Sequence, residues 1–277
     1  MKVPQLKKKT ELKSCHNTSW EDDYSWVHQP NILEVLKDSS KLDPEVRKYL
    51  EEENNYTEHH LKDTKGIQKT LFDEIKGRIK LDDESIPFKD RNYEYWTRTT
   101  TKGNYSIKLR KKIGTDLIEE YWNGDEEKKK LNTEYFGVGD IEVSYNDKIL
   151  GYSLDLKGSE YYTIYLRDIE TNKIISEKIE DTAGGITFSL DDKFIFYSKL
   201  DKFHRPRKIY RHKIGDNISN DKLIFEEKSD AFTVGINLTS DEKYFIITSS
   251  DHNTSEQYYF KSTEENPEPK LIKKRNK

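Results

Sequence analysis

The chain has 277 residues, enough for one large or two small domains, and 36% of them are charged against 32% hydrophobic. The net charge of -4 gives no general electrostatic argument for binding nucleic acid. A single cysteine, Cys15, excludes an intrachain disulfide, and no apolar run is long enough to cross a membrane. Because the N-terminus also lacks the apolar stretch of a secretory signal, we expect a cytoplasmic protein without membrane or nucleic-acid partners.

Three segments are expected before residue 85. Residues 1–15 are basic and predict a disordered arm. Residues 16–84 predict a docking strip followed by a helical arm. In the strip, Trp20–Val27 reads WEDDYSWV and indicates an extended stretch whose aromatic rings dock onto another surface.

The helical arm is expected between Asp43 and Ile79. Asp43 is a good N-cap, and Pro44 suits the first helical position. Thr64 is expected to begin a second helix. The helical period places the following residues on one face of the first and second helix, respectively: Val46, Tyr49, Leu50, Glu53 and Tyr56; Ile67, Leu71, Phe72, Ile75 and Ile79.

From residue 85 to 277 the sequence repeats. GGITFSLDDKFIFYSK, which begins at Gly184, has alternating apolar residues around the turn pair Asp191-Asp192. Similar segments lie about 45 residues earlier and 50 later, at VSYNDKILGYS and LTSDEKYFIIT. In this alignment Lys193 matches Lys148 and Lys243, Tyr197-Ser198 matches Tyr152-Ser153, and Ile209-Tyr210 matches Ile164-Tyr165 and Tyr259-Phe260.

A repeat of this length with four short strands predicts β-propeller blades. We expect a mainly β fold with about four blades of a partial propeller, preceded by the strip and the two-helix arm. The outermost strand of the second blade is placed at Ile174–Ile179, and a hairpin turn of the first at Lys102–Asn104. Four blades must close among themselves or belong to a larger ring, because an uncovered blade face is unstable.

No residue pattern predicts catalysis, a cofactor or a metal site. Gly151-Tyr152-Ser153-Leu154-Asp155 lacks the second glycine of a hydrolase elbow, and its Tyr-Ser pair belongs to the repeat. Gly137-Val138-Gly139 lacks the third glycine of a dinucleotide motif and reads as an interblade loop. The remaining candidates favour solvated or loop roles over ligand or catalytic ones: Asp22-Asp23, His59-His60, His204, Arg205 and Arg207.

Four segments, read in order, resemble the prolyl oligopeptidase family, most closely its oligopeptidase B (protease II) branch. They are DDYSWV, DPEVRKYLEEENNYTEHHL with FDEIKGRIKLDDESIPFKDRNYEYWTR, and DTAGGITFSLDDKFIFYSKLDKFHRPRKIYRHKIG, and the resemblance covers residues 16–260. It implies a cytoplasmic serine peptidase in which a seven-bladed propeller covers an α/β-hydrolase domain and restricts access to small peptides. The branch cleaves after Lys and Arg, with its catalytic residues in the hydrolase domain.

No catalytic residue carries over to this sequence, because the resemblance ends before a hydrolase domain. We therefore expect an N-terminal propeller fragment that is inactive alone and whose partner is the missing C-terminal hydrolase domain, in cis or as a separate chain. Small basic peptides would be its substrates once assembled. The alternatives are a free-standing propeller that serves as an interaction platform, and one half of a split peptidase.

Overall fold

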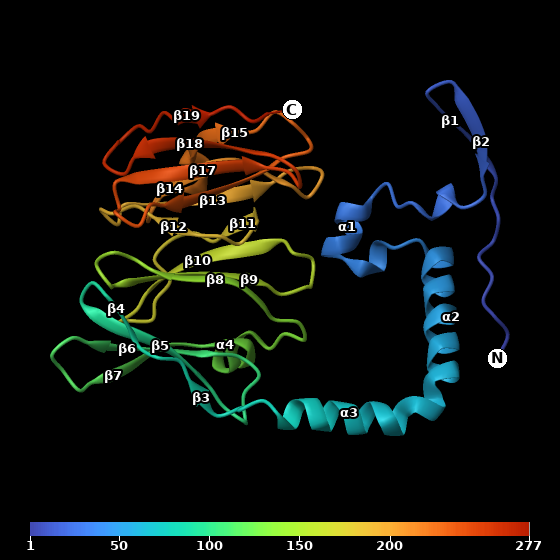
Figure 1. The fold of residues 1–277 in the computed structure, drawn as a ribbon, viewed down its shortest axis with the longest axis horizontal. Helices are drawn as coiled ribbons and strands as arrows, with labels where there is room; N and C mark the ends of the chain where they lie inside the picture. Colours follow the sequence, from blue (N-terminus) through green and yellow to red (C-terminus); the bar gives the residue numbers. More distant parts are fainter. Residues whose placement is uncertain (277) are drawn as a thin grey trace. The chain divides into compact units, whose positions relative to one another are not determined.

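The chain changes from helices to strands close to residue 82. The computed structural model describes residues 1–276. Contacts divide the chain into a first unit, Met1–Leu81, and a second unit, Asp82–Lys277. This boundary lies three residues before the one expected from the sequence. The elements are labelled in Figure 1.

The first unit begins with a hairpin. Strands β1 (Glu11–Cys15) and β2 (Thr18–Asp22) pair antiparallel, with Ser14 opposite Ser19. Its turn residues His16 and Asn17 both have positive φ, 48° and 61°, as a two-residue hairpin turn of mirror-image type requires. The expectation of disorder is therefore wrong for residues 11–15, because this turn lets the arm pair with the strip that follows it.

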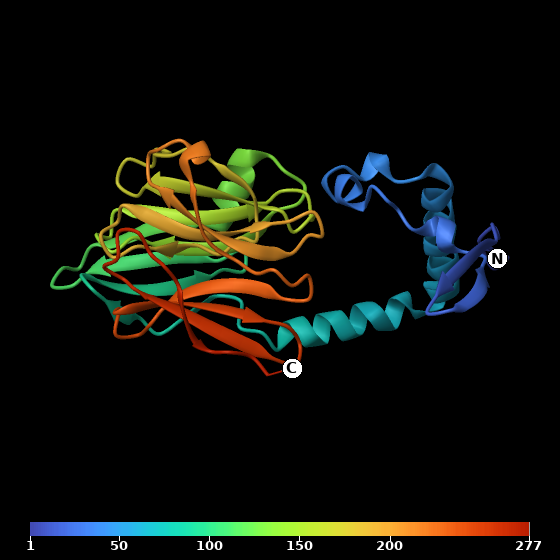
Figure 2. The same cartoon turned by 90° about the horizontal axis from the view of Figure 1, so that it is seen from above.

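Helices make up the rest of the first unit. Short turns, η1 (Ser25–Val27), α1 (Ile32–Lys37) and η2 (Ser39–Lys41), precede α2 (Pro44–Leu61), and η3 (Lys62–Thr64) joins it to α3 (Lys65–Gly77). The Asp43 carboxylate accepts hydrogen bonds from the amides of Glu45 and Val46, which confirms the predicted N-cap. Figure 2 shows α2 and α3 as separate rods joined at η3.

The second unit contains four blades, each of four antiparallel strands with one short extra strand in the first. The strands, blade by blade, are β3 (Asp83–Glu84), β4 (Phe88–Asp90), β5 (Tyr93–Thr99), β6 (Ile107–Lys112) and β7 (Ile118–Asn123); β8 (Gly137–Val143), β9 (Ile149–Asp155), β10 (Tyr162–Asp168) and β11 (Ile179–Thr182); β12 (Thr187–Phe188), β13 (Phe194–Leu200), β14 (Pro206–Lys213) and β15 (Lys222–Glu226); β16 (Thr233–Leu238), β17 (Tyr244–Ser250), β18 (Ser255–Lys261) and β19 (Lys270–Lys273). Helix α4 (Gly124–Leu131) links the first blade to the second, and η4 (Ile218–Asn220) precedes β15. The mainly β propeller fold is thus confirmed.

The outermost strand of the second blade differs from its expected position. Ile174 makes one isolated bridge to Arg167, and the regular strand β11 begins only at Ile179. Between them, Ser176 and Glu177 accept or share hydrogen bonds with residues of the third blade, including His212 and Ile218. These contacts draw the segment away from the blade edge where the repeat placed it.

The second and third blades form one continuous sheet. β11 pairs with β13 through Thr182 and Lys199, and the amide of Ala183 donates to the carbonyl of Ser198 at 3.0 Å. Seven strands therefore run from β15 to β8 in one hydrogen-bonded order, and β12 pairs with β13 beside them, whereas the first and fourth blades are separate sheets among the described residues.

The inner turn of each repeat has the same hydrogen bonds. Ser189 donates to Asp191, whose carboxylate accepts from the amide of Lys193. Thr239, Asp241 and Lys243 repeat this pattern, as do Ser144, Asn146 and Lys148. The next position in the turn adopts positive φ in each case: Asp147, Asp192 and Glu242. The lysine alignment made from sequence is confirmed at the level of backbone geometry.

Cross-strand pairs confirm one half of the alignment and correct the other. Tyr152 pairs with Tyr165 exactly as its repeat partner Tyr197 pairs with Tyr210. In the fourth blade the equivalent position is Ile247, which pairs with Tyr258. The assignment of Tyr259-Phe260 to this pair is wrong by two residues, because the β17–β18 connection is shorter than the β13–β14 connection.

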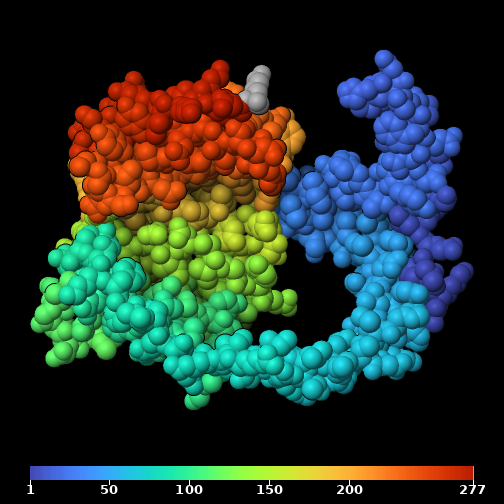
Figure 3. Space-filling view, viewed as in Figure 1, coloured from blue at the N-terminus to red at the C-terminus, as the bar shows by residue number. Residues whose placement is uncertain are grey.

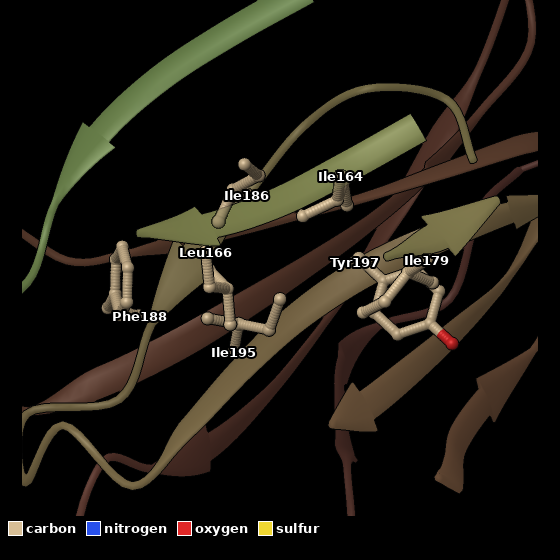
Figure 4. Close-up of a cluster of buried hydrophobic side chains, with 7 residues drawn as sticks. All are labelled: Ile164, Leu166, Ile179, Ile186, Phe188, Ile195 and Tyr197. Carbon is tan, nitrogen blue, oxygen red and sulfur yellow. The ribbon is translucent and has the colours of Figure 1, made fainter. Parts of the chain in front are cut away.

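Buried apolar clusters lie between neighbouring blades. Figure 4 shows the cluster between the second and third blades, where Ile195 from β13 lies beside Leu166 from β10. Phe196, Phe245 and Phe260 belong to the cluster between the third and fourth blades. Trp122 and Tyr152 belong to the cluster that joins the first blade to the second. Each of the three junctions between consecutive blades thus buries apolar side chains.

Candidate functional site

The segment 201–207, which connects β13 to β14 and includes the first two residues of β14, is held by its own side chains. We call it the HRPR loop after His204–Arg207. The Asp201 carboxylate accepts hydrogen bonds from the amides of Phe203 and Arg205, at 2.8 and 3.1 Å. Burial opposes ionisation of Asp201, but these amides and Arg207 outweigh it and lower its pKa. His204 adopts positive φ, and its imidazole Nε2 lies 3.1 Å from the carbonyl oxygen of Ser159.

The HRPR loop presents Lys202, Phe203 and Arg205 to solvent. Phe203 is 53% exposed, and Arg205 is exposed with no side-chain partner among residues 1–276. Arg207, by contrast, is bound to Asp201 and Asp230, and the His204 ring stands edge-on to Tyr161 with centroids 4.5 Å apart. The expectation of a loop contact for His204 is confirmed. This fixed frame presents an aromatic ring and two cations, with the Lys202 ammonium 4.9 Å from the centroid of the Phe203 ring, and is suited to recognition and not to acid–base chemistry.

Ser153 and the two glycines belong to the propeller framework. Ser153 is fully buried in β9, and its hydroxyl donates to the carbonyl of Gly184 at 2.7 Å. Its repeat partner Ser198 donates in the same way to the carbonyl of Val234 at 3.2 Å. Gly137-Val138-Gly139 begins β8 and is not an interblade loop. A Cβ at Gly139 would lie 2.6 Å from the Ser153 hydroxyl, so close packing explains this glycine.

The other candidates of the first unit have local partners. Asp22 accepts from the amide of Tyr24, and Asp23 binds the ammonium of Lys8 at 2.6 Å and the hydroxyl of Thr10. His60 stacks against Tyr56, with ring centroids 4.2 Å apart. Among residues 1–276, no group of three or more His, Cys, Asp or Glu side chains is placed to hold a metal ion.

Sequence reasoning missed one cluster in which a serine, a histidine and an aspartate are hydrogen-bonded in series, as they are in a hydrolase triad. The hydroxyl of Ser176 lies 2.8 Å from His212 Nε2, and His212 Nδ1 lies 2.7 Å from Asp221. Asp221 also accepts from the hydroxyl of Tyr197, and burial together with Asp221 raises the Tyr197 pKa. Ser176 stands in the irregular segment before β11, so the repeat alignment gave no signal that these residues meet.

The geometry of this cluster fits a role in stabilising the fold and not a role in catalysis. His212 has no exposed surface, so a substrate's leaving group has no path to its ring nitrogen. The nearby amide of Gly215 points at the Ser176 oxygen itself, at 3.4 Å, and not at a space where an oxyanion would form. The cluster instead fastens the outer edge of the second blade to the third.

Helix α3 carries a continuous uncovered apolar stripe. The stripe comprises Ile67, Leu71, Phe72, Ile75 and, just beyond the helix, Ile79, and these residues are between 49% and 62% exposed. In the space-filling view, no other segment of residues 1–81 covers the face of α3 that is seen (Figure 3). An apolar stripe of this length typically marks an interaction surface. No helix among the described residues is long and apolar enough to span a membrane.

Comparisons with known proteins agree over nearly the whole chain. Residues 4–277 match the family described as prolyl oligopeptidase, N-terminal beta-propeller domain. The chain is 28% identical over 269 residues to a dipeptidyl aminopeptidase BI of Pseudoxanthomonas mexicana, covering 91% of this chain and 36% of that protein. It is 27% identical to protease 2 of Moraxella lacunata, covering 92% of this chain and again 36% of the relative.

Solved structures show the same fold. Oligopeptidase B from Leishmania major superposes with a TM-score of 0.86 at 22% identity, covering 99% of this chain and 40% of that one. Oligopeptidase B from Trypanosoma brucei, solved with covalently bound antipain, gives a TM-score of 0.85 at 22% identity and covers the same share of its length. The chain therefore spans little more than a third of the length of the proteins that it matches.

Proposed function

Since this chain belongs to the prolyl oligopeptidase N-terminal β-propeller family, we propose that it is the propeller-bearing part of an oligopeptidase B-like serine peptidase. In this proposal a C-terminal α/β-hydrolase domain, in the same polypeptide or in another, supplies the catalytic residues. The propeller restricts the site to small peptides, and the assembled enzyme cleaves after Lys and Arg. The observation that carries the proposal is the family match over residues 4–277.

The α3 stripe supports the proposal of a hydrolase partner. Burying five large apolar side chains of this kind stabilises a contact by about 1.5–3 kcal/mol each when burial is complete. Roughly two thirds of the length of the matched relatives lies outside the region that this chain covers. A hydrolase domain from that part is the occupant that we propose for the stripe.

The HRPR loop supports a role beside the peptide path. The β13–β14 connection has the same place in its blade as the β5–β6 connection, where the amide of Thr101 donates to Asp82 at the entry to the first blade. In this proposal the connections at this end of the sheets face the hydrolase domain. Phe203 and Arg205 are then available to contact either that domain or a peptide.

The test is to isolate, from the source cell, the native polypeptide that carries these residues. We expect antibody capture to retain a serine that reacts with a fluorophosphonate probe, located outside residues 1–277 by mass spectrometry. The captured material should hydrolyse fluorogenic peptides ending in Arg or Lys at least about tenfold faster than those ending in Pro or Ala.

Two results would contradict the proposal. One is capture of a 32.9 kDa polypeptide with no reactive serine in any associated chain. The other is hydrolysis by the purified 277-residue chain itself that survives removal of contaminating peptidases. A captured enzyme that prefers Pro over Arg and Lys would retain the family role and overturn the basic specificity.

A further inference from the structure

A cavity of about 580 Å³ lies between the third and fourth blades, near the turn that joins β12 to β13. Aromatic rings form much of its wall: Phe194, Phe196, Phe245 and Phe260. The loop between β18 and β19, residues 262–269, contributes the remaining side through Ser262 to Asn266. This volume falls in the range of small-molecule sites, about 300–1,000 Å³.

Arg211 from β14 lines the cavity and lacks a charge partner. Its guanidinium stands 4.3 Å from the centroid of the Phe194 ring, and one nitrogen donates to the backbone carbonyl of Glu265. Arg211 makes no ion pair with any residue between 1 and 276, and its exposed fraction is 6%. Burial lowers its pKa, with Asp191 opposing this effect only from a distance.

The other buried arginines show that this is unusual in the molecule. Arg110 binds Glu119 at 2.8 Å, and Arg167 binds Glu127 at the same distance. Their exposed fractions, 5% and 6%, match that of Arg211. Buried cations are ordinarily paired because desolvation of the charge is costly. An anionic group that entered the cavity would give Arg211 the partner that the chain itself provides for the other two.

The carboxylates around the cavity limit the negative charge that a ligand can carry. Asp191 is engaged within its own turn by Ser189 and by Lys193, whose ammonium lies 3.1 Å away. Glu264 accepts from the amide of Lys261 at 3.3 Å. Together with Glu265, these acids give the rim more negative than positive charge, which disfavours phosphates and other polyanions.

We propose that this cavity binds a monocarboxylate attached to an aromatic or branched apolar group. The carboxylate would pair with Arg211 while the apolar group lies against the phenylalanine rings. The C-terminal residue of a short peptide and a free aromatic acid share this chemistry. The site consists of described residues of the second unit alone, so it does not rest on the proposed peptidase function.

The experiment is calorimetric titration of the full chain with N-acetyl-phenylalanine and with its amide. We expect saturable binding of the acid and at least about tenfold weaker binding of the amide, since only the acid can form the ion pair. Gly-Gly-Phe and its C-terminal amide form a second arm. Tighter binding of Gly-Gly-Phe than of N-acetyl-phenylalanine assigns the site to peptide ends, and the reverse order assigns it to free acids.

Two variants locate the site. Arg211→Met removes the charge at similar volume, and we expect about a tenfold or greater loss of affinity for the acid. Thr263→Trp fills the cavity from its exposed rim without touching Arg211, so it decides the question if the Arg211 variant does not fold. Arg98→Met, at an arginine of β5 that pairs with Glu84 outside the cavity, is the control and should bind normally. Absence of saturation, equal affinity for acid and amide, or normal binding by the folded cavity variants would overturn the proposal.

Discussion

Phe72 and Phe245 show how differently the two units use an apolar side chain. Phe245 in β17 is 1% exposed and packs against the rings of Phe196 and Phe260. Phe72 in α3 is 62% exposed, and the ammonium of Lys76 lies 5.8 Å from its ring centroid. Among described residues, Val46 is the one buried apolar side chain of residues 1–81, whereas the second unit contains three buried clusters.

This contrast separates two sources of order. The blades are held by tertiary burial, which each blade obtains from its neighbour. The first unit is held by local interactions: the Asp43 cap, surface ion pairs such as Lys69–Asp73, and the short hairpin of β1 and β2. Surface pairs of this kind contribute little, about 0–1 kcal/mol each, so the arm depends on the helix-forming sequence and on a partner for its stripe.

The largest effect is expected from Phe245→Ala. Removing a buried ring leaves a cavity between the third and fourth blades, and we expect a loss of about 3–5 kcal/mol in the free energy of unfolding. Urea denaturation followed by near-ultraviolet circular dichroism measures it. Phe72→Ala is the matched control, with an expected change within about 0.5 kcal/mol. Equal losses for the two variants would mean that the stripe is already covered in solution.

An intermediate effect is expected from Glu227→Gln, because this carboxylate ties the fourth blade to Arg275. Arg275 binds Glu227 at 2.8 Å, and Ser249 donates to the same carboxylate. Removing one partner of such a buried pair costs about 3 kcal/mol. Denaturant titration at pH 7 measures the loss. Glu226→Gln, at the neighbouring and more exposed position, should change stability by less than about 1 kcal/mol.

The same variant makes the acid dependence testable. Burial opposes the ionisation of Glu227, but hydrogen bonds from Arg275 and Ser249 outweigh it and lower its pKa to about 2, from 4.5. A depressed folded-state pKa contributes stability above pH 4.5 that is lost as the pH falls toward 2. The stability difference between the native chain and Glu227→Gln should therefore shrink between these two values. A difference that stays constant with pH would show that ionisation of Glu227 does not contribute to the free energy of unfolding.

The smallest effect is expected from Asp43→Ala in the arm. Loss of the cap leaves two amides at the start of α2 without their acceptor, which costs about 1 kcal/mol. Hydrogen exchange should accelerate in residues 45–50 and stay unchanged in β16–β19. Accelerated exchange in both places would show that the two units unfold together and that the first unit does not depend on local interactions alone.

Sequence reasoning succeeded where one short-range rule determines the structure. The cap at Asp43 and the repeated turns at Lys148, Lys193 and Lys243 depend on neighbours within a few residues. Strand alternation was enough to place nearly all blade strands, because a face buried between blades requires it. The resemblance to the peptidase family came from ordered motifs and is confirmed by the family match.

The misses depend on contacts between distant segments. Ser176 leaves the blade edge because His212 and Asp221 lie beside it, and no local pattern encodes that meeting. That Arg211 has no ion pair within residues 1–276 is likewise visible only when the third and fourth blades are placed together. In the fourth blade, a shortened connection moved the true partner to Tyr258, which a fixed repeat length cannot anticipate.

The pairing of β11 with β13 has a mechanical consequence. Parting the second and third blades requires breaking the backbone hydrogen bonds around Thr182 and Lys199. At the junctions on either side, side chains form the hydrogen-bonded links, such as Tyr95 with Asp147 and Ser198 with the carbonyl of Val234. Rotating a side chain takes less energy than breaking backbone hydrogen bonds between strands. Residues 137–226 should therefore move as one rigid body, with more flexible junctions to the first and fourth blades.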